Sequence, residues 1–181
     1  MRGTKNIVRH ILSTGQHRRL ISSEEGATAV EFALIAPAFL ALLLAIFEVG
    51  IVLLMQQALQ TATTKAARLI LTGQAQSQNI TAANFQQQVC NNATSLFSCA
   101  NLYVNVQTFS SFSSVSMMNP VQNGTFNPAN MSYSLGGPGS IEVVQVFYEW
   151  PVYLGPLGFD LSNMNGNIHL LVATAAFRNE P

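Results

Sequence analysis

Charged side chains are scarce in this sequence. Only 9% of its 181 residues are Asp, Glu, Lys or Arg, whereas 49% are hydrophobic. An ordinary soluble domain has roughly 25% charged residues. The length is sufficient for one modest domain, and the composition indicates that part of the chain lies in lipid.

The residues that usually perform catalysis are scarce as well. Asp160 is the only aspartate, and His169 is the only histidine after residue 26, inside a strand-like run. These residues cannot supply a carboxylate pair or a Ser, His and Asp set. The sequence also contains no phosphate-binding loop and no cluster with metal-ligand spacing. We therefore expect no enzyme, no cofactor and no metal site, and we expect His169 to be packed or hydrogen-bonded.

The few basic residues are concentrated at the N-terminus. Residues 1–26 contain five of the eight Lys and Arg residues, against Glu24 and Glu25. The five are Arg2, Lys5, Arg9, Arg18 and Arg19. Since no basic patch follows this leader, nucleic-acid binding is not expected.

A long apolar run follows the leader. From Phe32 to Met55 the only ionisable residue is Glu48, and a helix of this length rises about 36 Å, enough to span a hydrocarbon core of about 30 Å with some tilt. The positive-inside rule places the leader in the cytoplasm and the chain after about Met55 across the membrane. Pro37 predicts a tolerated local kink. Glu48 is expected at the far interface as a solvated end charge.

The helical pattern continues beyond the lipid segment. Apolar residues recur at steps of three and four, and polar residues take the other faces. The apolar set is Met55, Ala58, Leu59, Ala62, Ala66, Leu69 and Ile70, and the polar set is Gln56, Gln57, Gln60, Thr63, Thr64 and Arg68. Gly73 fits a C-cap. The sequence thus predicts one helix over about residues 27–73, roughly 70 Å long, which is transmembrane over about residues 32–55.

A glycine and a glutamate stand at the start of this helix. A basic leader ending in Gly26, then ATAVEF over residues 27–32 and an unbroken apolar run, resembles the class 3 signal of type IV pilins and pseudopilins. More closely, GATAVEFALIAPAFLALLLAIFEVG over residues 26–50 is similar to the TadE family of the tight adherence (Tad, or Flp) pilus system. The closing AAFRNEP over residues 175–181 also resembles the end of many TadE-like proteins. The resemblance covers roughly residues 24–70.

The resemblance implies a processing site and an assembly residue. A prepilin peptidase would cut between Gly26 and Ala27 on the cytoplasmic side. The new α-amino group of Ala27 is a cation, and the Glu31 carboxylate, one helical turn away or on a neighbouring subunit, would neutralise it in a low-dielectric bundle. The alternative is that Glu31 favours the helix dipole and lies among headgroups.

Small residues on the same helix suit close contact with other helices. Ala29, Ala33 and Ala36 lie on one helical face. In membranes, small residues allow neighbouring helices to approach closely. We therefore expect these three alanines to take part in helix packing.

Residues 74–181 are predicted to form an α+β domain. Thr81 fits the N-cap of a helix over residues 82–89, and strand patterns occupy residues 102–109, 141–150 and 168–177. Residues 110–139 form a long loop in this interpretation, and residues 151–161 form a connection. Because the strand over residues 141–150 is apolar on both faces, the predicted fold is a long N-terminal helix packed on a small antiparallel sheet. The resemblance implies the same pilin-like arrangement.

The two cysteines of the chain, Cys90 and Cys99, lie beyond the membrane segment. The bacterial periplasm permits a disulfide, yet on one continuous helix their Cα atoms would be about 13 Å apart, too far for a bridge. A disulfide therefore requires the helix to end between them, where Asn91 and Asn92 are suitable breakers. Two free thiols are the alternative.

These observations predict a minor pseudopilin of a Tad pilus, single-pass in the bacterial inner membrane, with its N-terminus cytoplasmic and residues 74–181 periplasmic. Its expected partners are the prepilin peptidase, other pilins and pseudopilins, and the inner-membrane pilus assembly platform. One alternative is an unprocessed single-pass envelope protein whose outer domain binds a ligand or scaffolds another complex. A second is a soluble protein released by signal peptidase, and a third is a glycoprotein with sequons at Asn79, Asn92, Asn123 and Asn130.

Overall fold

A computed structural model describes residues 26–93, 97–155 and 158–181. The described residues fall into two compact units, which divide between Leu43 and Leu44. Of the predicted leader over residues 1–26, residues 1–25 lie outside the described residues.

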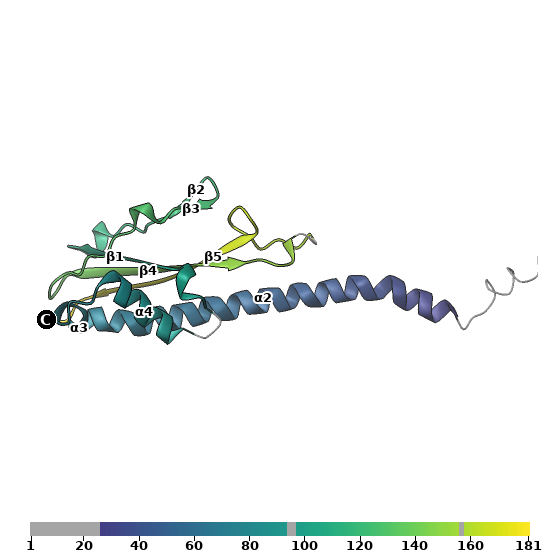
Figure 1. Ribbon diagram of the computed structural model, residues 1–181, viewed down its shortest axis with the longest axis horizontal. Coiled ribbons are helices and arrows are strands. Elements are labelled where there is room, and N and C mark those ends of the chain that lie inside the picture. Colours follow the sequence, from purple (N-terminus) through teal and green to yellow (C-terminus); the bar gives the residue numbers. More distant parts are fainter. Residues whose placement is uncertain (1–25, 94–96, 156–157) are drawn as a thin grey trace, which may run out of the picture. The chain divides into compact units, whose positions relative to one another are not determined.

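Helix α2 spans Ala27–Leu71 and is helical across Pro37 (Figure 1). Its C-terminal end agrees with the sequence, since Gly73 has a left-handed φ of 72°. The Gly73 backbone N–H donates to the Ile70 carbonyl oxygen at 3.0 Å. This is the conformation that favours glycine just after a helix, so the predicted cap is confirmed.

The second unit is built on a three-stranded antiparallel sheet. The strands are β1 (Leu102–Phe109), β4 (Ile141–Pro151) and β5 (Ile168–Arg178), in the order β1-β4-β5. Val144 on the central strand pairs with Val106 on β1 and with Ala175 on β5. A long helix on a small antiparallel sheet is the fold predicted from the sequence, and that prediction is confirmed.

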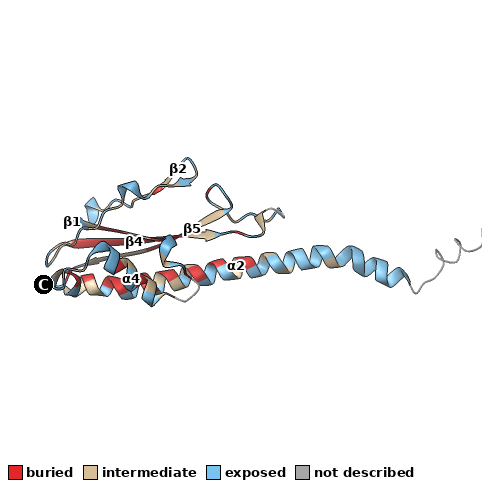
Figure 2. Ribbon diagram, in the orientation of Figure 1, coloured by how far each residue is buried: buried red, intermediate tan, exposed pale blue. Residues whose placement is uncertain are grey.

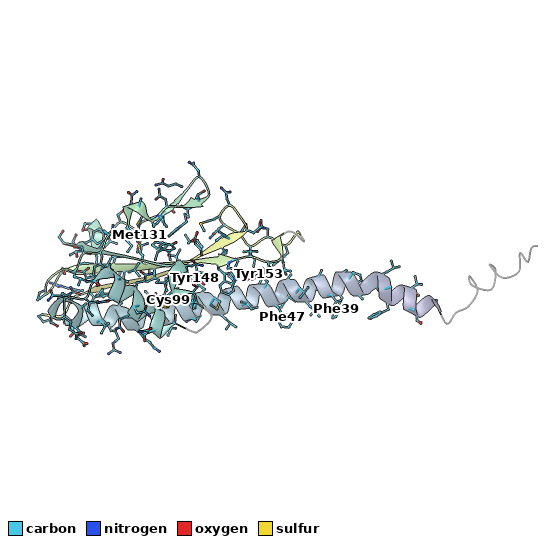
Figure 3. All side chains as sticks on the ribbon, in the orientation of Figure 1. Phe39, Phe47, Cys99, Met131, Tyr148 and Tyr153 are labelled. Atoms are coloured by element: carbon cyan, nitrogen blue, oxygen red, sulfur yellow. A yellow bond between two sulfur atoms is a disulfide. The ribbon has the colours of Figure 1, made fainter. Side chains whose placement is uncertain are left out.

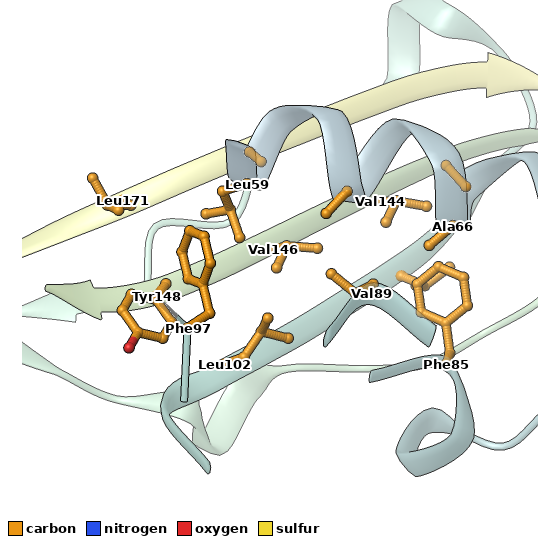
Figure 4. Close-up of a cluster of buried hydrophobic side chains, with 14 of the residues drawn as sticks. Leu59, Ala66, Phe85, Val89, Phe97, Leu102, Val144, Val146, Tyr148 and Leu171 are labelled. Atoms are coloured by element: carbon orange, nitrogen blue, oxygen red, sulfur yellow. The ribbon is translucent and has the colours of Figure 1, made fainter. Parts of the chain in front are cut away.

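The C-terminal part of α2 packs on this sheet through leucine and small residues (Figure 4). Leu59 and Ala66 are fully buried, together with Val144 and Val146 of β4. Alanine has no side chain beyond Cβ, so helix and sheet can approach closely. Thr63, predicted on a polar face, is instead fully buried. Its hydroxyl can lie in the core because it donates to the Leu59 carbonyl oxygen at 2.8 Å, which satisfies its polarity within the helix.

Two glutamines of α2 bond to the free edge of β5. The Gln56 side-chain amide donates to the Val172 carbonyl oxygen at 2.7 Å. The Gln60 amide donates to the Thr174 carbonyl oxygen at 2.9 Å and accepts from the Thr174 N–H at 3.2 Å. An unpaired strand edge invites pairing with other chains, and these contacts cover part of it.

Helices α3 (Gln74–Ser77) and α4 (Ala82–Asn92) follow α2. The Thr81 hydroxyl oxygen accepts from the Asn84 N–H, so the predicted N-cap is confirmed. Helix α4 ends at Asn92, and the chain returns to a short 3₁₀ turn that begins at Cys99. Cys90 and Cys99 form a disulfide with a Cα–Cα distance of 5.7 Å.

The segment predicted as a long loop covers the other face of the sheet. It contains a small hairpin, β2 (Val121–Gln122) with β3 (Thr125–Phe126). The hairpin was missed, although Asn123-Gly124 is a strong hairpin signal; both residues have positive φ, 51° and 74°. Phe126 packs on Tyr103 with a centroid distance of 4.6 Å. Strand β4 is therefore buried on both faces, which explains its apolar pattern.

The C-terminal residues fasten the end of α2 to the sheet. The Asn179 N–H donates to the Ser140 carbonyl oxygen at 2.9 Å, and the Glu180 N–H donates to the Leu71 carbonyl oxygen at 3.0 Å. The Arg178 Nε donates to the Gly139 carbonyl oxygen at 2.9 Å. The closing sequence motif thus has a structural role in the second unit.

Candidate assembly surface and the Glu48 contact

The predicted processing site lies at the start of α2. Gly26 directly precedes the helix, and both Gly26 and Ala27 are exposed. A Cβ placed on Gly26 would meet no atom of the described structure within 4 Å. No described residue therefore covers the peptide bond between Gly26 and Ala27 at this point. Residues 1–25 of the leader lie outside the described residues.

The predicted assembly residues follow on the first turns of α2. Glu31, Ala29 and Ala33 are exposed, and Ala36 is half-buried. The three alanines are spaced by four and three residues, so they share one helical face. At these three positions the side chains are small, so a second helix can approach the backbone.

Figure 2 shows that most of the N-terminal part of α2 is exposed, and many of its exposed residues have large apolar side chains. Phe32 is 72% exposed and Leu34 is 75% exposed. The other exposed members between Val30 and Phe47 are Val30, Ile35, Phe39, Leu40, Leu42, Leu44, Ile46 and Phe47. By length and composition α2 can cross a membrane. A surface of this kind is stable only against lipid or against other apolar helices.

Glu48 is buried, whereas the sequence predicted a solvated side chain. It was expected as a solvated end charge, but it is only 8% exposed. Its Oε1 accepts from the backbone N–H groups of Tyr153 at 2.6 Å and Leu154 at 3.2 Å. These residues follow the end of β4, more than a hundred positions away in sequence. The carboxylate is buried because it satisfies two backbone donors of a turn, a contact that no local sequence pattern reveals.

A small cavity lies beside this contact. It has a volume of about 200 Å³ and is lined by Leu44, Phe47, Glu48, Ile51, Trp150, Tyr153 and Leu154. Tyr153 is 71% exposed, and the second carboxylate oxygen of Glu48 has no hydrogen-bond partner in the described structure. Figure 3 shows Phe47 on α2 and Tyr153 on the turn after β4. The lining is apolar apart from Glu48.

A second buried carboxylate, Glu142, lies at the start of β4, and the sequence analysis missed it. It is fully buried and accepts from the Gly136 N–H at 2.6 Å and from the Thr108 hydroxyl at 3.0 Å. Burial raises the pKa of Glu142, while these hydrogen bonds act in the opposite direction. A Cβ at Gly136 would collide with the Ser140 side chain and the Glu142 carboxylate. The site is closed and structural, with no room for a substrate.

The other candidate polar residues form no reactive group. His169 is half-buried, and its Nδ1 bonds to the Leu161 carbonyl oxygen at 2.6 Å, so the prediction of a hydrogen-bonded histidine is confirmed. Within residues 26–93, 97–155 and 158–181, no group of three or more His, Cys, Asp or Glu side chains could hold a metal ion. Asp160 is exposed, and hydrogen bonds from Ser162 lower its pKa.

Comparison with protein families supports the resemblance noted in the sequence. Residues 26–68 match the family model described as TadE-like protein. Comparison with curated proteins and with solved structures finds no match. The match covers the start of α2, the exposed apolar surface and the first part of the helix that packs on the sheet. The chain therefore carries a TadE-like segment, which associates it with the Tad pilus system.

Proposed function

From the TadE-like match over residues 26–68, we propose that this protein is a minor pseudopilin of a Tad pilus. In this proposal a prepilin peptidase cuts after Gly26, and the mature chain begins at Ala27. The observation that carries it is the coincidence of three features: the exposed glycine, the start of α2 directly after it, and the exposed apolar helix that follows. The protein acts through helix contacts and performs no reaction.

The position of Glu31 supports a role in assembly. It is exposed on a helix that otherwise presents apolar side chains. A carboxylate costs free energy in lipid, roughly 2.5 kcal/mol at the bilayer centre. The new ammonium group of Ala27, in the same chain or in a neighbour, would offset part of this cost. Ala29, Ala33 and Ala36 would let that neighbouring helix approach.

Two features support a periplasmic location for residues 74–181. The basic leader precedes the membrane segment, which favours a cytoplasmic N-terminus. Cys90 and Cys99 form a disulfide, and such bonds persist in oxidising compartments such as the periplasm. In this orientation the folded domain is presented to the pilus assembly platform and to other pilins.

The competing function is an unprocessed membrane-anchored domain that binds a ligand or scaffolds another complex. A pocket of about 550 Å³ lies beside β1 and is lined by residues such as Gln107, Met118 and Ser132. It is an open surface hollow with no unpaired buried polar group, so nothing about it identifies a ligand.

The N-terminus of the mature protein distinguishes the two functions. We would determine the N-terminal sequence and intact mass of the membrane-fraction protein, from cells with and without the prepilin peptidase. A peptidase-dependent start at Ala27 is the expected result. An intact leader in both strains would refute the pseudopilin proposal.

A substitution at Glu31 tests the assembly step separately from processing. Glu31→Ala and Glu31→Gln are expected to be processed normally but to reduce the number of pili and the amount of this protein that co-purifies with other pilins. Thr28→Ala, an exposed neighbour in the same turn, is the matched control. If the Glu31 variants assemble like this control, the carboxylate serves only the helix dipole or the headgroups.

A further inference from the structure

The Glu48 contact restricts how deep α2 can lie in a bilayer. The turn after β4 bonds to Glu48 through the backbone of Tyr153 and Leu154. If the lipid segment ended near Met55, Glu48 and this turn would lie about 10 Å inside the hydrocarbon boundary. Irregular backbone exposed to lipid does not occur at that depth. On the side of α2 that carries this turn, the hydrocarbon core must therefore end near Glu48, and the exposed apolar residues Leu53 and Leu54 then lie in the interface.

The helix before Glu48 is long enough for this shorter span. From Ala27 to Glu48 an α-helix rises about 32 Å, which matches a hydrocarbon core of about 30 Å. The residues around Glu48 then lie at the level of the outer headgroups. This step rests on the proposed membrane insertion of α2.

The side chains around Glu48 have the chemistry of that level. We define the tip surface as Phe47, Ile51, Trp150, Tyr153 and Leu154, which line the cavity together with Leu44 and Glu48. Phe47 is 66% exposed, Ile51 is 47% exposed and Tyr153 is 71% exposed. Trp and Tyr are enriched at membrane interfaces because they have an apolar body and a polar end. The tip surface also continues the exposed apolar surface of α2 through Leu44 and Phe47.

Glu48 makes this position of the turn energetically possible. Without an acceptor, the two N–H groups of Tyr153 and Leu154 would face a poorly hydrated region, at a free-energy cost of several kcal/mol for each group fully in hydrocarbon. The carboxylate accepts both hydrogen bonds and is itself shielded. Among the described residues that line the cavity, Glu48 is the one with a charged side chain.

We propose that the tip surface contacts phospholipids of the outer leaflet at the boundary between acyl chains and headgroups. The turn after β4 is thereby a second membrane contact of the protein, in addition to the transmembrane part of α2. It sets the depth of the helix and holds the folded domain against the bilayer surface. The cavity beside Glu48 accommodates the upper part of an acyl chain.

Trp150 is the only tryptophan of the chain, so its fluorescence reports on the tip surface without any labelling. The full chain is reconstituted in phosphatidylcholine vesicles that carry bromine, a fluorescence quencher, at shallow or deep positions of the acyl chains. We expect strong quenching that is greater for shallow than for deep bromine. Flotation of the same vesicles shows independently whether the protein is inserted.

A matched pair of variants completes the test. Tyr153→Asp places a charge on the tip surface and is expected to lower the quenching of Trp150 at least twofold. Phe112→Asp, at a residue that is 61% exposed elsewhere on the domain, is expected to leave it unchanged. Protein that floats with the vesicles while Trp150 escapes bromine quenching would overturn this inference and leave membrane anchoring intact. If the protein does not float with the vesicles, both this inference and the proposed membrane anchoring are overturned.

Discussion

One helix serves two environments in this protein. In residues 26–47, α2 exposes large apolar side chains on most of its surface, with small residues on one face. In residues 48–71 the exposed positions become polar after Leu54, and the buried face, which includes Met55, Leu59 and several alanines, belongs to the core. The two parts belong to one continuous helix, and they differ in what covers their side chains. The exposed apolar residues of the first part need lipid or another protein to cover them, whereas the sheet covers the buried residues of the second part.

The largest contrast should come from the same substitution in the two parts. Leu59 is fully buried and Leu42 is 59% exposed. Leu59→Ala leaves a cavity and should lower the free energy of unfolding by about 2–5 kcal/mol. Leu42→Ala should change it by less than about 0.5 kcal/mol. Denaturant unfolding of the full chain in detergent measures both. Equal effects would mean that the two parts do not differ as described.

Removal of the disulfide should have the next largest effect. It should lower the stability of the second unit, residues 44–181, alone. The bond between Cys90 and Cys99 closes a short loop, for which chain entropy predicts roughly 2–3 kcal/mol of stability. The double variant Cys90→Ser with Cys99→Ser should unfold at correspondingly lower denaturant, as should the reduced wild type. Insertion of α2 in vesicles should be unaffected, and a loss of insertion would argue that the two parts are coupled.

Glu48 lies where the two environments meet. Glu48→Ala removes the acceptor of two hydrogen bonds, and hydrogen bonds to charged groups contribute about 1.5–3 kcal/mol. The backbone amides of Tyr153 and Leu154 should then exchange with deuterium about 10- to 100-fold faster. Glu48→Gln keeps an acceptor oxygen, so its exchange rates should lie between those of Glu48→Ala and those of the wild type. Unchanged exchange in Glu48→Ala would show that the contact does not fix the turn.

The smallest effect should come from Glu142, through the pH dependence of stability. Burial raises its pKa in the folded protein above the unfolded value, so the folded state binds the proton more tightly. This contribution is fully present below the unfolded pKa, near 4.5, and is lost as the pH rises through the folded pKa. The wild type should therefore gain stability relative to Glu142→Gln on acidification from pH 7 towards pH 5. If the difference between the two proteins stays constant over this range, the assignment is wrong.

The sequence predicts the regular elements of this fold well and its long-range polar contacts poorly. The periodicity from Met55 to Ile70 and the strands over residues 102–109, 141–150 and 168–177 agree with the structure, because side-chain spacing reflects burial directly. Thr63 and Glu48 were assigned to water because they are polar. Each is buried because it bonds to a backbone group, Thr63 within its own helix and Glu48 on a turn far away in sequence. Only the Glu48 contact lies wholly beyond local pattern analysis, because its partners are far away in sequence.

The residues of the candidate site also differ in how far the sequence alone reveals them. The motif around Gly26 and Glu31 is contiguous, so its resemblance to TadE-like proteins is visible in the sequence; the processing and assembly roles of these residues stay predictions. The tip surface could not, since Phe47 and Tyr153 meet only when β4 and α2 are packed together. Glu142 was overlooked because its hydrogen-bond donors come from several segments of the chain.

The most direct test of the account asks what covers the exposed part of α2 in the cell. Phe32 and Phe39 are 72% and 57% exposed, so each can be replaced by the larger photo-crosslinking analogue benzoylphenylalanine without a clash inside the described structure. The account predicts that light links both positions to other pilin or pseudopilin subunits, and that Phe112 on the folded domain, used as the control, gives no such adducts. Subunit adducts at Phe112 with none at Phe32 or Phe39 would contradict it.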